Sequence, residues 1–176
     1  MPSASACFVD VKPGSWPNSI NVCNNGVIPV GIACSAVNLE AEELKNDIAM
    51  IKVVIKYYDN DAETPCWKWA TWKEFTENDI DKLKLNIEDV TCLVGSVEER
   101  GYENYDGTDD CPDLIMKFRT QDIFGCFDPS MYEGKEVRFY VYAYSSCGDE
   151  IFNSFDEIRF APVNFDELDS NEKQKK

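Results

Sequence analysis

The sequence predicts an all-β fold, an antiparallel β-sandwich of about eight strands with one or two short helical turns. Apolar and polar residues alternate over several segments, turn-forming residues separate these segments, and little of the chain follows the period of a helix. No internal repeat and no second block of composition is found. One domain over residues 8–163 is therefore expected, between an N-terminal arm (residues 1–7) and a polar, disordered tail (residues 164–176).

The first strands are short and separated by turn signals. Residues 8–11 form an apolar segment, and residues 16–21 are a turn-rich connection of Pro, Asn and Ser. The strand expected over residues 27–32 contains Pro29, which cannot donate a hydrogen bond to a neighbour. This strand is therefore expected at a sheet edge or beside a bulge. Residues 39–46 are expected to form two helical turns.

The clearest strand covers residues 48–58. Alternation separates its two faces, with Ile51, Val53, Ile55 and Tyr57 on one and Met50, Lys52, Val54 and Lys56 on the other. Another extended segment follows over residues 67–72. Residues 83–85 and 90–94 are weaker strand candidates around a polar turn.

The last third of the chain contains a second long strand, expected over residues 136–145. One face of it is apolar and the other carries one arginine and three tyrosines: Arg138, Tyr140, Tyr142 and Tyr144. Before it, alternation directs Leu114, Met116 and Phe118 inward, and residues 120–125 are expected to form a helical turn. Residues 158–160 are the last strand expected.

Charge and composition exclude several classes of function. Seventeen basic and thirty-three acidic residues give a net charge of −16, which disfavours nucleic acid and anionic membranes as partners. No apolar run approaches the 18 residues of a membrane span. The chain has no histidine, hence no Ser-His-Asp or Cys-His arrangement, and no motif singles out a catalytic carboxylate pair. The protein is therefore not expected to be an enzyme.

The eight cysteines are dispersed, and none forms a C-x-x-C pair. Zinc sites normally have closely spaced ligands, so up to four disulfides in an oxidising, extracellular compartment are expected instead. The alternative is a set of buried free thiols. Residues 1–6 lack the basic and apolar regions of a signal peptide, so the signal is expected to have been removed or replaced by another export route.

An acidic loop precedes the strand that begins near residue 114. Its candidate metal ligands are Asn104, Asp106, Asp109, Asp110 and Asp113, grouped around Gly107. Oxygen ligands of this kind suit Ca²⁺, and clustered carboxylates repel one another without a cation. The EF-hand pattern is only loosely met, and no helices are expected on either side. The alternative is a solvated acidic turn.

Three segments resemble a widespread module of secreted bacterial and archaeal proteins. Residues 9–21 (VDVKPGSWPNSIN) with residues 26–30 (GVIPV) are similar to its opening D-I-K-P-G-S-x-P-N-x-I-N … G-V-I-P-V-A-I. The acidic loop with residues 113–121 (DLIMKFRTQ) is similar to D-x-D-G-D-G-x-x-D-L-x-x-x-F-x-T-Q. Residues 156–159 (DEIR) resemble the closing S-D-S-I-R.

The resemblance implies an extracellular β-sandwich-like module, often fused to other surface domains, with a calcium loop and no known catalytic role. Position by position, it places the loop ligands on Asn104, Asp106, Asp109 and Asp113. This chain departs from the pattern by one inserted residue near Thr108, and by Asp110 in place of a glycine. Residues 33–101 depart most.

The leading functional hypothesis is a non-enzymatic, calcium-binding extracellular structural module that acts in surface adhesion or assembly. Its partners would be other surface proteins or further copies of itself. In the second case residues 7–11 would add a strand to a neighbour's sheet edge. The alternative is that this segment pairs within its own domain.

The second hypothesis is a carbohydrate-binding module with aromatic platforms. The candidate rings are Trp67, Trp69, Trp72, Tyr140, Tyr142 and Tyr144. Exposed rows of such rings can stack on sugars, whereas buried ones would fill a second core face. The hypothesis loses its basis if Trp67, Trp69 and Tyr142 are all buried.

Overall fold

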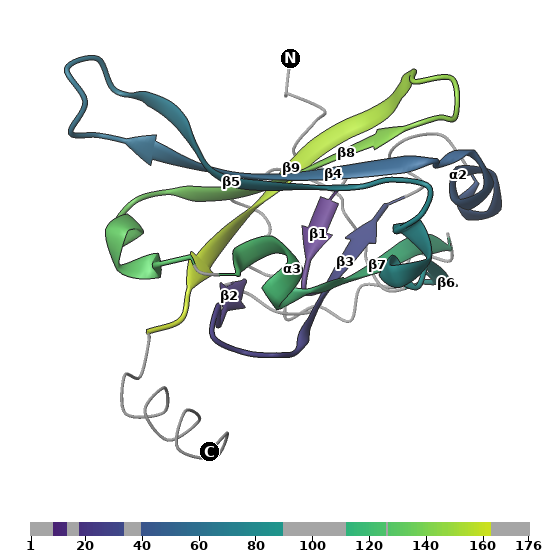
Figure 1. Cartoon of the computed structure of the whole chain (residues 1–176), viewed down its shortest axis with the longest axis horizontal. Helices are drawn as coiled ribbons and strands as arrows, with labels where there is room; N and C mark the ends of the chain where they lie inside the picture. The colour runs from purple at the N-terminus through teal and green to yellow at the C-terminus, as the bar shows by residue number, and fades with distance from the viewer. Residues whose placement is uncertain (1–8, 14–17, 34–39, 90–111, 126, 163–176) are drawn as a thin grey trace.

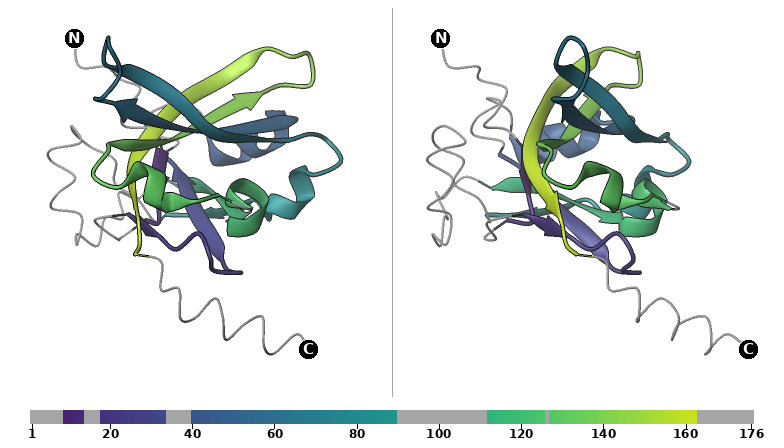
Figure 2. Two further views of the ribbon diagram at one scale, coloured as in Figure 1. Left: turned by 60° about the vertical axis from the view of Figure 1, so that its left-hand side comes forward. Right: turned by 90° about the vertical axis from the view of Figure 1, so that its left-hand side faces the viewer.

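The computed structural model of the 176-residue chain describes residues 9–13, 18–33, 40–89, 112–125 and 127–162. Within these ranges, strands dominate and form one four-stranded and one five-stranded sheet. The two sheets lie one above the other (Figure 1), and the side views separate them into two layers (Figure 2). The predicted all-β sandwich is therefore confirmed. The expected arm and tail, residues 1–7 and 164–176, lie outside the described residues.

The four-stranded sheet has the order β1-β3-β7-β6 and is antiparallel throughout. Its strands are β1 (Val9–Val11), β3 (Val27–Ile32), β7 (Asp113–Arg119) and β6 (Asn86–Glu88). β1 pairs with β3 of its own sheet, which is the alternative to the strand addition considered for residues 7–11.

The five-stranded sheet has the order β2-β9-β8-β4-β5. Its strands are β2 (Ser19–Ile20), β9 (Glu150–Phe160), β8 (Val137–Tyr144), β4 (Met50–Asp59) and β5 (Cys66–Phe75). Only the short β2–β9 pair is parallel among the strand pairs of the described residues. The β4–β5 and β8–β9 hairpins project from opposite ends of this sheet (Figure 1).

Aromatic rings join the two sheets at the centre of the core. Phe118 of β7 is fully buried, and its ring centroid lies 5.4 Å from that of Phe75 on β5 and 5.9 Å from that of Phe139 on β8. The inward residues expected from alternation, Leu114 and Met116, belong to the same buried cluster. This continuous contact stabilises the sandwich because apolar area is removed from water on both faces at once.

The helical segments are short. They are α2 (Ala41–Asp47), α3 (Thr120–Phe124) and the 3₁₀ turns η2 (Ile80–Leu83) and η4 (Pro129–Tyr132). The helical turns expected over residues 39–46 and 120–125 are thus confirmed to within two residues. In the described part of the chain, no helix has the length and apolar character needed to cross a membrane.

The strand with Pro29 was expected at a sheet edge or beside a bulge, but β3 lies between β1 and β7, and its pairings with them show no register shift. The Pro29 carbonyl accepts a hydrogen bond from the Lys12 nitrogen at 2.7 Å. A residue's nitrogen and carbonyl point to the same neighbour in a strand, so the missing N–H faces the place where β1 has ended. No ladder bond is lost there, since the last paired residue of β1 is Val11.

Other boundaries also differ from the sequence prediction. Residues 83–85 form no strand: Leu83 ends η2, and Lys84 has a left-handed φ of 47°. The short strands β2 and β6 were not expected, and β9 begins eight residues before the strand predicted over 158–160. The candidate strand over residues 90–94 lies outside the described residues.

A buried carboxylate joins segments of the two sheets. Asp156 of β9 is fully buried, and its Oδ2 accepts hydrogen bonds from the Val11 backbone nitrogen and from Asn18 Nδ2, both at 2.9 Å. Its Oδ1 accepts from the Glu157 nitrogen at 2.9 Å. Asn18 and Asp156 belong to the first and third of the segments singled out in the sequence. These two segments therefore meet in space.

Candidate functional site

Six aromatic side chains predicted as a platform lie on one face of the five-stranded sheet. Trp67, Trp69 and Trp72 come from β5, and Tyr140, Tyr142 and Tyr144 come from β8, with β4 between the two strands. The opposite face of β8 carries Val137, Phe139, Val141 and Ala143, which belong to the core. The rings therefore lie on the outer side of the sandwich, and we call this set of six residues the aromatic face.

The tryptophans are the most accessible part of the aromatic face. Trp69 is 59% exposed and Trp72 is 51% exposed, whereas Trp67 and the three tyrosines are half-buried. Val54 of β4 lies beneath them on the same face and is only 1% exposed. Neighbouring side chains thus cover the sheet while leaving two large apolar rings in water.

Two lysines of β4 lie among the rings. Lys52 Nζ is 5.4 Å from the ring centroid of Trp69 and 5.3 Å from that of Trp72. Lys56 Nζ is 4.6 Å from the ring centroid of Tyr140. These distances place both ammonium groups within the range of cation–π attraction. The lysines therefore help to hold the rings in place.

Arg138 is held between two rings. The carbon of its guanidinium lies 3.9 Å from the ring centroid of Trp67 and 4.1 Å from that of Phe155 on β9. Its Nη1 donates a hydrogen bond of 3.3 Å to the hydroxyl of Tyr140. Contacts with two rings and one hydrogen bond leave this planar group little freedom to rotate.

The tyrosine row is packed, and the phenols of Tyr142 and Tyr144 are held in the neutral form. The rings of Tyr140 and Tyr142 are stacked, with centroids 6.2 Å apart. Burial raises the pKa of the Tyr142 phenol, and Tyr140, Tyr144 and Glu150 act in the same direction. Burial also raises the pKa of Tyr144. Their hydroxyl groups therefore remain available as hydrogen-bond donors.

Of the five predicted calcium ligands, the structure describes Asp113, while Asn104, Asp106, Asp109 and Asp110 lie outside the described residues. Asp113 is the first residue of β7 and is fully buried. Alternation with the core residue Leu114 places it on the outer side of the four-stranded sheet, as it does Asp10 of β1, which is 3% exposed. No group of three potential metal ligands occurs among the described residues alone.

Three cysteines fall within the described residues. Cys23, Cys66 and Cys147 carry free, exposed thiols, and the other five cysteines lie outside those residues. The described part of the chain thus contains no disulfide, and the three thiols lie in a turn and at the ends of two hairpins. Disulfide formation stays a prediction.

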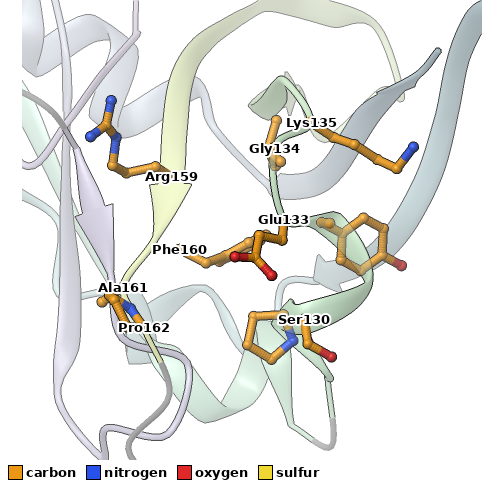
Figure 3. Close-up of a pocket in the computed structure, with 11 residues that line it drawn as sticks. Ser130, Glu133, Gly134, Lys135, Arg159, Phe160, Ala161 and Pro162 are labelled. Atoms are coloured by element: carbon orange, nitrogen blue, oxygen red, sulfur yellow. The ribbon is translucent and has the colours of Figure 1, made fainter.

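A pocket of about 370 Å³ lies between η4 and the end of β9 (Figure 3). Its charged lining residues are Glu133, Lys135 and Arg159. The ammonium of Lys135 extends away from Arg159 in this view and pairs with Asp61 at 3.1 Å. The pocket therefore brings no set of reactive groups together.

Comparison with known proteins adds little. No protein-family model matches the chain, and no curated protein is similar to it in sequence. One similar solved structure is that of Astrotactin-2, described as a conserved, vertebrate-specific, perforin-like membrane protein involved in neuronal development. It matches 97% of this chain with 12% identity and a TM-score of 0.31, and this chain spans 25% of that chain. A match this distant carries no argument about function.

The six rings were predicted from the sequence, but the cations among them were not. Lys52, Lys56 and Arg138 had already been placed by alternation on the polar faces of their strands. The missing information was the strand order, which brings β5, β4 and β8 together.

Proposed function

We propose that this protein is a non-enzymatic, extracellular adhesion module that binds saccharides on its aromatic face. The observation that carries the proposal is the gathering of six rings from β5 and β8 on one solvent-facing side, with Trp69 and Trp72 more than half exposed. Exposed tryptophans of this kind are unusual unless they contact a ligand or partner. This was the second of the two hypotheses raised by the sequence.

The physical fit lies in the surface of a sugar ring. Its C–H groups form apolar patches that pack flat against an aromatic ring, while its hydroxyl groups bond to polar neighbours. The rings stand on long paired strands, and the lysine and arginine contacts restrict their motion, so little freedom is lost on binding. The sheet supplies a preformed surface for an extended chain of sugars.

Replacing Trp72 by alanine is expected to weaken saccharide binding about tenfold. A ring that buries about 60 Å² of apolar area contributes about 1.5 kcal/mol at 25 cal/mol per Å², which corresponds to about a tenfold change in Kd. Binding would be measured by calorimetry on saccharides selected from a panel of neutral and acidic oligosaccharides. Trp69→Ala is expected to act alike.

The matched control is Met131→Ala, which removes another exposed apolar side chain, 68% exposed, in η4 and away from this face. It should leave the Kd unchanged. The proposal is overturned if no oligosaccharide of the panel binds, or if Trp72→Ala and Met131→Ala give the same affinity as the wild type.

We further propose that calcium stabilises the module, as the acidic loop suggests. The supporting observation is the fully buried Asp113, at the point where this loop joins β7. Its carboxylate, with the oxygens of Asn104, Asp106, Asp109 and Asp110, is the donor set that Ca²⁺ prefers. A bound cation would offset carboxylate repulsion and tie the loop to the four-stranded sheet.

Calcium is therefore expected to raise the melting temperature relative to a chelator. At a hundredfold excess over Kd, binding to the folded state alone adds about 2.7 kcal/mol, or roughly 5–11 °C for a chain of this size. Asp113→Asn should reduce this calcium-dependent shift, whereas Asp149→Asn, at an exposed turn, should preserve it. Equal melting temperatures in calcium and chelator would remove calcium from the account.

A further inference from the structure

We propose that the saccharide bound by the aromatic face is acidic, and that Arg138 binds its carboxylate. This inference rests on the proposed saccharide binding and adds the chemical class of the ligand. The class is a short oligosaccharide in which uronic acid units lie between neutral units. Arg138 thereby becomes the residue that determines specificity, while Trp69 and Trp72 supply most of the apolar contact.

The first argument is the hydrogen bonding of Arg138. A guanidinium has five N–H donors, and the described residues provide an acceptor for Nη1 alone, the hydroxyl of Tyr140. Nε is buried and has no hydrogen-bond acceptor among the described residues. Nη2 has no partner among the described residues and does not belong to the buried unpaired atoms, so it stays accessible from solvent.

The second argument is the missing counter-ion. This chain has thirty-three acidic residues, and Glu157 is the register partner of Arg138 on β9. Even so, no carboxylate of the described residues lies within 4.0 Å of the guanidinium, which is flanked by Trp67 and Phe155 instead. A planar guanidinium whose contacts restrict its orientation, and whose Nη2 stays accessible, can donate a charge-assisted hydrogen bond to a carboxylate.

The third argument is the row in which Arg138 lies. Arg138 of β8, Lys56 of β4 and Trp69 of β5 are register partners across three adjacent strands. Strand spacing of about 4.8 Å places Arg138 about 10 Å from Trp69. A saccharide lying across the strands would thus contact Arg138 first, then Lys56, and then the exposed ring of Trp69. Neither Lys56 nor Lys52 forms an ion pair within the described residues.

The acidic groups nearby limit how much charge the ligand can carry. Glu74 lies opposite Lys52 on β5, and Glu157 lies opposite Arg138 on β9. Together with the net charge of −16, they repel a dense polyanion such as nucleic acid or a heavily sulfated glycan. Isolated carboxylates separated by neutral sugar units suit this face best.

The test compares matched pairs of oligosaccharides that differ only in charge. Oligosaccharides from hyaluronan and unsulfated chondroitin, in which uronate units alternate with neutral units, would each be compared with the carboxyl-reduced form by calorimetry. For the wild type, reduction should weaken binding at least tenfold in one or more pairs. Arg138→Gln should bind both forms with the weaker affinity, and Arg138→Lys should recover only part of the preference, because a lysine keeps the charge but not the planar group that contacts Trp67 and Phe155.

Arg119→Gln is the matched control, since it removes an exposed arginine from the other sheet. It should keep the preference for the acidic form, and equal melting temperatures would show that the variants fold. The role of Arg138 would be overturned if the wild type bound the acidic and the reduced forms equally. If Trp72→Ala abolished that binding, saccharide binding by the aromatic face would still stand. If neither these pairs nor the neutral panel bind, both proposals fall. The inference would also be overturned if the protein formed dimers without saccharide that bury Trp69 and Trp72. The same holds if the protein bound acidic peptides but none of these saccharides.

Discussion

Phe118→Ala is expected to lower the free energy of unfolding by about 3–5 kcal/mol, the range for removing a fully buried phenylalanine ring. The ring lies between Phe75 and Phe139, with centroids 5.4 and 5.9 Å away, so it fills the space between the two sheets. Its loss leaves a cavity at a place where paired strands cannot move closer together. Urea denaturation should show a lower midpoint with an unchanged slope.

Two further variants make this result specific. Phe118→Leu keeps most of the volume and should cost less than the alanine variant, while Met131→Ala at an exposed position should stay within about 0.5 kcal/mol of the wild type. A loss below about 1 kcal/mol for Phe118→Ala would mean that the sheets do not meet at this ring. The sandwich packing described above would then be wrong at its centre.

The faces of the long strands were predictable because their residues alternate. In β8, Val137, Phe139, Val141 and Ala143 point to the core while the tyrosines point outward, as a period of two requires. The same holds for Ile51, Val53 and Ile55 of β4. Local sequence suffices here because side-chain direction depends only on position within the strand.

Alternation alone could not predict that the tryptophans of β5 and the tyrosines of β8 lie on the same face. Trp69 and Trp72 are three residues apart, so a regular strand would place them on opposite faces. The pairing of Thr71 with Ile55 and of Trp69 with Lys56 skips Ala70, and this β-bulge returns both rings to one face. Strand order then places β5 and β8 on either side of β4, and such order depends on contacts far apart in the chain.

The first part of β9 was not predicted from the sequence, because polar residues lie on its inner face. Ser154 and Asp156 are fully buried on the side that faces the other sheet, where a sequence pattern expects apolar residues. A buried carboxylate is tolerated when its oxygens accept hydrogen bonds, and both donors to Asp156 Oδ2, Val11 and Asn18, lie more than 130 positions away.

Asp156→Asn is expected to destabilise the protein by about 3 kcal/mol, or roughly 6–12 °C in melting temperature. Both carboxylate oxygens accept hydrogen bonds from N–H donors, two at Oδ2 and one at Oδ1. The amide of asparagine has the same shape, but it turns one acceptor into a donor. Whichever way the asparagine amide is turned, its NH₂ group takes the place of an oxygen that accepted a hydrogen bond. At least one of the buried N–H donors named above therefore loses its acceptor.

The effect should exceed that of a local contact because Asp156 joins parts of both sheets. Val11 is the last residue of β1 in the four-stranded sheet, and Asn18 directly precedes β2 beside β9. Asn18→Ala removes one of the donors named above and should cost less than Asp156→Asn, whereas Asp149→Asn in the exposed hairpin turn should leave the melting temperature unchanged. If Asp156→Asn melts within about 1 °C of the wild type, the buried carboxylate does not hold β1 against β9, and the contact between the first and third sequence segments has no structural role.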